Sequence, residues 1–121
     1  IISLRRVPSG TPVSYGRRYY TTKETTIATI PIGYGDGYFR CLTGRAECLI
    51  RGKRYNIVGT ICMDECMVDI GDDNLECGDE VILIGRQGNE VITANQLAEK
   101  CGTIPYEVLT AISARVPRVF I

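Results

Sequence analysis

Strand-like patterns of hydrophobic and polar residues dominate the first two thirds of the chain. Runs rich in Ile, Val, Thr and Tyr are separated by clusters of Gly, Asp and Asn, the usual residues of turns. The predicted strands cover residues 1–6, 25–31, 46–50, 53–58, 63–70 and 80–84. Glycine in the short gap between two of these runs predicts a tight hairpin over residues 48–55. Short strands without a long helix between them predict a small β-barrel or β-sandwich.

Helical patterns appear only in the last third of the chain. Thr93 and Gln96 have the spacing of a capping box, in which each side chain bonds the backbone N–H of the other at a helix start. Leu97 and Ala98 supply the apolar side of this helix, and Gly102 ends it. The sequence therefore predicts a helix that begins after Thr93 and stops at Gly102.

A second short helix is predicted directly afterwards. Pro105 suits its first turn, where no backbone N–H is needed. Val108, Leu109 and Ile112 form its packed face, and Pro117 stops it. The predicted fold class is therefore mainly β, a small β-barrel or sandwich with two short helices near the C-terminus, in a single domain over residues 1–121.

The charge balance of the chain is neutral. It has 14 Lys and Arg against 14 Asp and Glu, which argues against a partner such as nucleic acid or an anionic membrane. The basic clusters at residues 17–18 and 51–54 are expected to be solvated loop charge. No apolar run approaches the ~20 residues of a membrane span, and the first residues do not resemble a signal peptide. The chain begins without Met inside a predicted strand, so we expect a piece of a longer protein.

Six cysteines allow three interpretations, a disulfide framework, a zinc site or buried thiols. They are Cys41, Cys48, Cys62, Cys66, Cys77 and Cys101. A disulfide framework is typical of small secreted chains with poor cores, whereas 45% of this chain is hydrophobic. A zinc site needs paired short spacings or histidines, and the chain has no histidine. We therefore expect structural thiols in a reducing cytosol and no metal site, with Cys62 and Cys66 buried on one face of a strand.

Three glycines at every second position, Gly33, Gly35 and Gly37, form the most unusual local pattern. Glycine permits positive φ and close approach of the main chain to another group. The pattern therefore predicts a turn that is packed closely against something else, with Tyr34 at the end of a strand. Asp36 is expected to stabilise this turn, because aspartate readily accepts hydrogen bonds from nearby backbone N–H groups.

Several blocks of the chain resemble the C-terminal domain of alanine racemase. They are residues 13–16 (VSYG), 30–37 (IPIGYGDG), 58–64 (VGTICMD) and 103–107 (TIPYE), and the match ends in residues 115–118 (RVPR). A single block of this kind would be weak, but here the blocks occur in order, at fitting spacings, over nearly the whole chain. The resemblance implies a C-terminal β domain whose N-terminal TIM-like barrel, the domain that binds pyridoxal 5′-phosphate, is absent from this chain.

The resemblance implies a catalytic role for Tyr15. Without it, the residue types around this position would favour a half-buried tyrosine with a structural role. In the family, the matching tyrosine is one of two acid/base groups that move the α-proton of the substrate. The other is a lysine of the barrel that also binds the cofactor, and none of Lys23, Lys53 or Lys100 lies in its motif. A phenol is a poor base near neutral pH unless its neighbours stabilise the phenolate, and the family supplies those neighbours largely from the barrel.

Further roles follow from the same resemblance. Met63 matches a residue whose backbone N–H holds the substrate carboxylate, and Tyr106 matches a tyrosine that bonds the cofactor phosphate and crowds the substrate side chain. Tyr34 and Arg40 match residues at the entrance of the site. Thr60 departs from the family pattern, which often has arginine there, and this puts the electrostatics of the entrance and the substrate range in doubt.

The function implied is that of a cytoplasmic bacterial alanine racemase, which supplies D-alanine for peptidoglycan. The full enzyme would be a head-to-tail homodimer in which Tyr15 and Met63 serve the barrel of the opposite subunit, and the fragment alone would be inactive. The alternatives are a non-catalytic β-barrel interaction module and a racemase for serine or another small amino acid. A pyridoxal-phosphate amino-acid decarboxylase fits less well, because residues 61–64 and Tyr15 together resemble the racemase.

Overall fold

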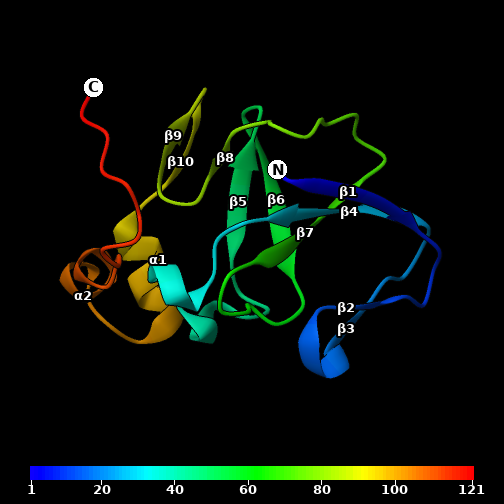
Figure 1. Cartoon of the computed structure of the whole chain (residues 1–121), viewed down its shortest axis with the longest axis horizontal. Coiled ribbons are helices and arrows are strands. Elements are labelled where there is room, and N and C mark those ends of the chain that lie inside the picture. The colour runs from blue at the N-terminus through cyan, green and yellow to red at the C-terminus, as the bar shows by residue number, and fades with distance from the viewer.

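The computed structural model describes all residues 1–121 and is built around one curled sheet of six antiparallel strands (Figure 1). The strands are β1 (Ser3–Val7), β4 (Thr25–Ile30), β5 (Glu47–Ile50), β6 (Lys53–Val58), β7 (Cys66–Gly71) and β8 (Val81–Ile82). Their order in the sheet is β1-β4-β7-β6-β5-β8. The edge strands β1 and β8 do not pair with each other, so the sheet is an open half-barrel. The predicted mainly β class is confirmed.

The predicted hairpin is confirmed, and two predicted strands are shorter than expected. Arg51 and Gly52 join β5 to β6, both with positive φ (49° and 77°), as a two-residue hairpin turn requires. The strand predicted over residues 80–84 is only the two-residue β8. The strand predicted from residue 63 begins at Cys66, because residues 62 and 63 bond to another loop and not to a neighbouring strand. Cys62 therefore lies outside the strand and is half-buried, so its predicted pairing with Cys66 on one strand face was wrong.

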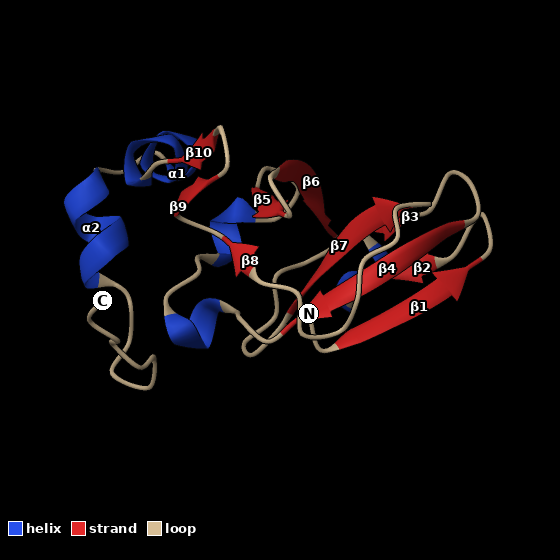
Figure 2. Ribbon diagram, turned by 90° about the horizontal axis from the view of Figure 1, so that it is seen from above, coloured by secondary structure: helices blue, strands red, loops and turns tan.

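Two small hairpins and three 3-10 helices complete the β portion. The hairpins pair β2 (Pro12–Val13) with β3 (Tyr19–Tyr20), and β9 (Gly85–Gln87) with β10 (Glu90–Ile92). The 3-10 helices are η1 (Tyr15–Arg17), η2 (Tyr34–Asp36) and η3 (Arg40–Leu42). Figure 2 shows the β2–β3 hairpin beside the β1–β4–β7 end of the sheet and the helices at the other end. None of these elements was predicted, because two or three residues are too few to show a hydrophobic period.

Helix α1 (Ala94–Cys101) confirms the predicted capping box. The Gln96 N–H donates to Thr93 Oγ1 at 3.1 Å, and the Thr93 N–H donates to Gln96 Oε1 at 2.8 Å. Gly102 ends the helix with a φ of 67°. Leu97 and Ala98 are buried, as predicted.

Helix α2 (Pro105–Thr110) is shorter than predicted and exposes part of its expected packed face. Pro105 lies in the first turn and Val108 is buried, but Leu109 is 49% exposed. The helix stops at Thr110, well before Pro117, and the rest of the chain is an irregular tail that begins with turns. Arg118 holds this tail by donating to three carbonyl groups within it, at Ile112, Ser113 and Val116. These bonds replace the helical ones that a longer α2 would have made.

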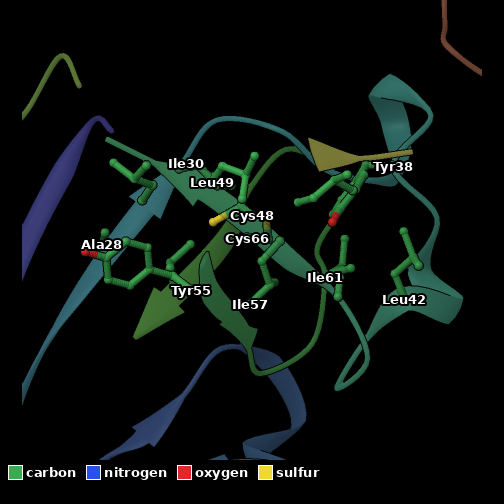
Figure 3. Packing of buried hydrophobic residues seen from close by; sticks show 14 of the residues in the cluster. Ala28, Ile30, Tyr38, Leu42, Cys48, Leu49, Tyr55, Ile57, Ile61 and Cys66 are labelled. Atoms are coloured by element: carbon green, nitrogen blue, oxygen red, sulfur yellow. The ribbon is translucent and has the colours of Figure 1, made fainter. Parts of the chain in front are cut away.

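The core joins strands of the sheet to both α-helices, and Figure 3 shows part of its packing. It contains 20 buried residues, among them Ile30, Leu49, Ile57 and Val68, which come from four different strands. Burial raises the pKa of the Cys48 thiol to about 12, with a smaller effect from the neighbouring carboxylate, so this cysteine is an inert core residue. A second cluster of three buried residues joins the sheet to the β2–β3 hairpin, namely Val13, Ile27 and Val58.

Two expectations about charged and sulfur-containing residues need correction. Cys41 and Cys101 form a disulfide, so only four of the six cysteines are free thiols. The basic cluster at residues 51–54 is ion-paired and not merely solvated. Its pairs are Arg51–Asp79 (3.0 Å), Lys53–Asp73 (2.6 Å), Arg54–Glu47 (2.9 Å) and Arg54–Glu90 (2.6 Å).

No helix has both the length and the apolar composition to cross a membrane.

Candidate functional site

Tyr15 lies on a turn with an unusual backbone, which we call the Tyr15 turn (residues 14–17). The turn connects β2 to β3, and its tyrosine is 76% exposed. Ser14 and Arg17 have positive φ (67° and 48°) although neither is glycine, and Gly16 does as well (78°). Such conformations cost energy for residues with a Cβ and persist when surrounding contacts hold them. The phenol is therefore presented to solvent by a locally strained backbone.

The strained turn is held by the loop that precedes β7. Ser14 Oγ donates to the Thr60 carbonyl at 2.5 Å and lies 3.4 Å from Cys62 Sγ. A Cβ at Gly59 would stand 2.7 Å from the Ser14 Cβ, so only glycine allows this approach. The Thr60 side chain is buried beneath the turn, and its hydroxyl has no hydrogen-bond partner. The two sequence blocks that contain Tyr15 and Met63 are thus packed directly against each other.

Met63 belongs to a second loop, the Met63 loop (residues 62–65), which is fixed by backbone bonds. The Tyr34 N–H donates to the Cys62 carbonyl at 3.0 Å, and the Gly35 N–H donates to the Met63 carbonyl at 2.8 Å. The Met63 N–H has no acceptor within the chain, and the residue is exposed. In a trans peptide the N–H points opposite to the carbonyl, so bonding of the Cys62 carbonyl turns the Met63 N–H away from Tyr34. This leaves a free donor on a rigid loop.

The three alternating glycines form the glycine turn (residues 33–37), and each lies close to a distant part of the chain. A Cβ at Gly33 would stand 2.0 Å from the Cys62 carbonyl oxygen. One at Gly37 would stand 2.3 Å from the Ala111 carbonyl oxygen, and one at Gly35 would collide with the Arg115 side chain. The predicted close approach is therefore confirmed, and it involves the Met63 loop and the C-terminal tail.

Asp36 stabilises the glycine turn, as predicted, and also makes an ion pair that was not predicted. Its Oδ2 accepts the Gly33 N–H at 2.9 Å, and its Oδ1 accepts Arg115 Nε at 2.7 Å. Burial alone would raise the pKa of Asp36, but these two bonds together hold it below its ordinary value. Sequence reasoning missed Arg115, although it opens the last of the family-like blocks.

The remaining predicted residues lie at the surface, and one lies far from the rest. Tyr34 is 43% exposed on η2, next to the Met63 loop, and Arg40 is exposed on η3 without an ion pair. Tyr106, on the first turn of α2, is 75% exposed. Both views place α2 at the opposite end of the molecule from the β2–β3 hairpin that carries Tyr15 (Figures 1 and 2). The structure thus brings Tyr15, Tyr34 and Met63 into one region and leaves Tyr106 outside it.

This region can exchange a proton and bind an anion, but it offers few groups to a cofactor. The Tyr15 phenol can donate or accept a proton, and the free Met63 N–H can donate to a carboxylate. Lys53, on β6, is paired with Asp73 at 2.6 Å. No group of three His, Cys, Asp or Glu side chains is arranged to hold a metal ion.

Comparison with known proteins gives a consistent family match. The model of the family described as "Alanine racemase, C-terminal domain" matches residues 1–120. The alanine racemase of Thermodesulfovibrio yellowstonii is 49% identical over 122 residues, which cover all of this chain and 34% of that protein. The alanine racemase of Clostridium novyi is 50% identical over 123 residues, covering all of this chain and 32% of that protein. The chain thus spans about a third of the length of these curated relatives.

Solved structures agree with the sequence comparison. The alanine racemase from Bacillus anthracis with bound L-Ala-P is 46% identical, with a TM-score of 0.95, and the match covers all of this chain and 31% of that one. The alanine racemase from D-cycloserine-producing Streptomyces lavendulae is 42% identical, with a TM-score of 0.94 over 99% of this chain and 31% of that one. The half-barrel with two short helices is therefore the fold of these domains.

Proposed function

Since the chain belongs to the alanine racemase family as its C-terminal domain, we propose that the full-length protein interconverts L- and D-alanine and that this domain supplies the proton-transfer group Tyr15. The observation that carries the proposal is the exposed phenol on a strained turn, packed against the loop with the free Met63 N–H. The product D-alanine would serve peptidoglycan synthesis in a bacterial cytoplasm.

Racemisation requires that a proton leave one face of Cα and return to the other, so two acid/base groups are needed. Tyr15 Oη exchanges the proton on one face. The Met63 N–H donates to the substrate carboxylate and fixes the orientation of Cα relative to the phenol. The second acid/base group lies outside this chain, and Tyr34 and Arg40 line the approach to the site.

Pyridoxal 5′-phosphate is the proposed cofactor, and this chain contributes little to its binding. When bound, it takes up the negative charge left on Cα after the proton departs. The Tyr106 phenol is exposed and free to donate a hydrogen bond to its phosphate. Covalent attachment and most other contacts come from the N-terminal barrel.

We further infer a head-to-tail homodimer with two shared sites. The β2–β3 hairpin, which carries Tyr15, and helix α2, which carries Tyr106, lie at opposite ends of the domain (Figures 1 and 2), so one domain is poorly arranged to place both tyrosines in a single site. In a dimer, Tyr15 and Met63 can enter the active site of the partner subunit while Tyr106 contributes to the other active site. Both ends of the domain are then used. The exposure of three tyrosines, Tyr15, Tyr34 and Tyr106, supports a surface that is covered in the full assembly.

Tyr15→Phe in the full-length enzyme tests the proposal. The substitution keeps the ring and removes the exchangeable proton, so we expect a loss of ~10²–10⁴-fold in abstraction of the α-proton from L-alanine. Proton exchange at D-alanine begins at the second acid/base group, which lies outside this chain, so its rate should fall less. Solvent deuterium incorporation, followed separately from each enantiomer, measures both rates.

Tyr20→Phe is a matched control, because Tyr20 is an exposed tyrosine on the same hairpin. It should leave both rates unchanged. An unchanged rate in Tyr15→Phe would reduce Tyr15 to a packing residue, and equal losses from both enantiomers would exclude one-sided chemistry. Parallel assays with L-serine decide whether the enzyme prefers alanine.

A further inference from the structure

The C-terminal tail returns to the glycine turn and places the Arg115 side chain against it. Arg115 Nε donates to Asp36 Oδ1 at 2.7 Å. Its Nη2 donates to Asp64 Oδ1 at 2.7 Å and to the Met63 carbonyl at 3.3 Å. The guanidinium lies over Gly35, where an added Cβ would stand 2.4 Å from Nη2. One side chain therefore joins three segments, namely the tail, the glycine turn and the Met63 loop.

This bridge acts on the peptide groups that surround the free donor of Met63. The Met63 carbonyl accepts both from the Gly35 N–H and from Arg115, and the preceding Cys62 carbonyl accepts the Tyr34 N–H. The peptide groups on either side of Met63 are thus both held in place by hydrogen bonds to their carbonyl oxygens. An N–H held in this way is preorganised for an acceptor, since no reorientation is needed when the acceptor arrives.

We propose that Arg115 is a positioning residue, which holds the Met63 loop against the glycine turn and thereby aims the Met63 N–H at the substrate carboxylate. The carboxylate rests on the proposed function, whereas the bridge itself does not. Arg115 also compensates two carboxylates, Asp36 and Asp64. Without it their negative charge would remain beside a site that binds an anion, and binding would weaken further.

The chemistry of the bridge requires arginine. A guanidinium is planar and donates in several fixed directions, so it can bond two carboxylates and a carbonyl at once. The lysine ammonium is a compact point charge without this fork, so Arg115→Lys should retain the charge balance and lose part of the geometry. Arg115→Met removes both while keeping an unbranched apolar stem.

The first test is steady-state kinetics of the full-length racemase. Arg115→Met should raise KM for L-alanine by about 10- to 100-fold with a much smaller change in kcat, because the lost interaction binds substrate and transition state alike. Arg115→Lys should lie between this variant and the wild type. Arg118→Met is the matched control, since Arg118 also makes three bonds from the tail, but only to carbonyls of the tail itself. It should leave KM unchanged.

The second test does not depend on activity. The chain contains two methionines, Met63 and Met67, so 15N-methionine labelling of the 121-residue chain gives two amide signals. Met67 lies in β7, paired with β6, and serves as an internal reference. Each of the two variants adds one further signal, from the methionine that the substitution introduces, so the Met63 and Met67 signals are followed from their wild-type positions. Arg115→Met should shift and broaden the Met63 signal and leave that of Met67 unchanged, whereas Arg118→Met should affect neither.

The two tests separate this proposal from the proposed function. An unperturbed Met63 amide in Arg115→Met would overturn the bridge, whatever the enzyme does. Equal KM values in the wild type, Arg115→Met and Arg118→Met would reduce Arg115 to a purely structural role. A full-length wild-type protein without racemase activity would overturn the proposed function, and the amide signals would still decide whether Arg115 positions Met63.

Discussion

At the scale of single residues, the Asp36 carboxylate joins segments that are far apart in the chain. It bonds the Gly33 N–H within its own turn and Arg115 in the C-terminal tail, and it is largely shielded from solvent. Burial favours the neutral carboxyl group and would raise its pKa, but the two bonds lower the pKa of Asp36 in the folded state. A carboxyl group of this kind stabilises the fold at pH values above its ordinary pKa, and the stabilisation is lost as the pH falls through the folded-state pKa.

Asp36→Asn should therefore destabilise the chain in a pH-dependent manner. At pH 6 we expect a loss of about 1–2 kcal/mol in the free energy of unfolding, because the charge-assisted bond to Arg115 is lost. At acid pH, below the folded-state pKa of Asp36, the wild type protonates this carboxyl group and loses the same contribution, so the difference between the two proteins should shrink. Urea unfolding at both pH values measures it, with the exposed Asp72→Asn as a control that should show little change. A difference independent of pH would contradict the assignment.

Residue-level roles could be predicted where they depend on local chemistry. The turn-stabilising role of Asp36 followed from the tendency of aspartate to accept from nearby backbone N–H groups, and the bond observed, from Gly33, spans only three residues. Arg115 contacts Asp36 and Asp64 across 79 and 51 positions, and nothing in a local pattern indicates such pairs. The exposure of Tyr15 agrees with its predicted role, but the role itself came only from the resemblance and stays a prediction.

At the scale of elements, the disulfide joins α1 to η3. Cys101 is the last residue of α1, and Cys41 lies in η3 directly after Arg40. Arg45 supports the same junction by donating to the Lys100 carbonyl at 3.0 Å. The bond closes a loop of 60 positions, which restricts the unfolded chain considerably.

Loss of the disulfide should lower the free energy of unfolding of the oxidised chain by about 2–4 kcal/mol. Cys41→Ser combined with Cys101→Ser removes it, and thermal unfolding with and without a dithiol reductant measures the effect. The reductant should lower the Tm of the wild type and leave that of the double variant unchanged. Cys77→Ser is the control, because Cys77 is exposed and free. A wild-type Tm that does not respond to the reductant would show that the bond contributes nothing.

Elements could be predicted where a few neighbouring residues determine them. The capping box of α1 and the Arg51–Gly52 hairpin are local, and both were predicted correctly. The 3-10 helices that carry Tyr15, Tyr34 and Arg40 have three residues each and contact distant parts of the chain. The first two lie against the loop before β7, and the third lies against α1. The Cys41–Cys101 pair likewise has no local signal, so reasoning from composition assigned both residues as thiols.

At the scale of the whole molecule, the exposed tyrosines that we propose for the site lie in two separate regions of the domain. Ser14, next to Tyr15, bonds the loop that leads to Met63, whereas Tyr106 lies on α2, at the opposite end of the molecule from the β2–β3 hairpin (Figure 1). The chain spans about a third of the length of the curated relatives. In a head-to-tail dimer each domain would contribute Tyr15 to one site and Tyr106 to the other.

Subunit complementation tests this arrangement. One full-length variant carries Tyr15→Phe, and the other lacks the cofactor-binding lysine of the barrel, so each homodimer should be almost inactive. If Tyr15 acts in the site of the partner, a mixed dimer contains one site with both groups intact and one with neither. Random exchange of subunits at equal concentrations should then restore about a quarter of the wild-type activity, since half of the dimers are mixed and each has one working site of two. If Tyr15 acted in its own subunit, every site in the mixed dimer would lack one group, and mixing would restore no activity.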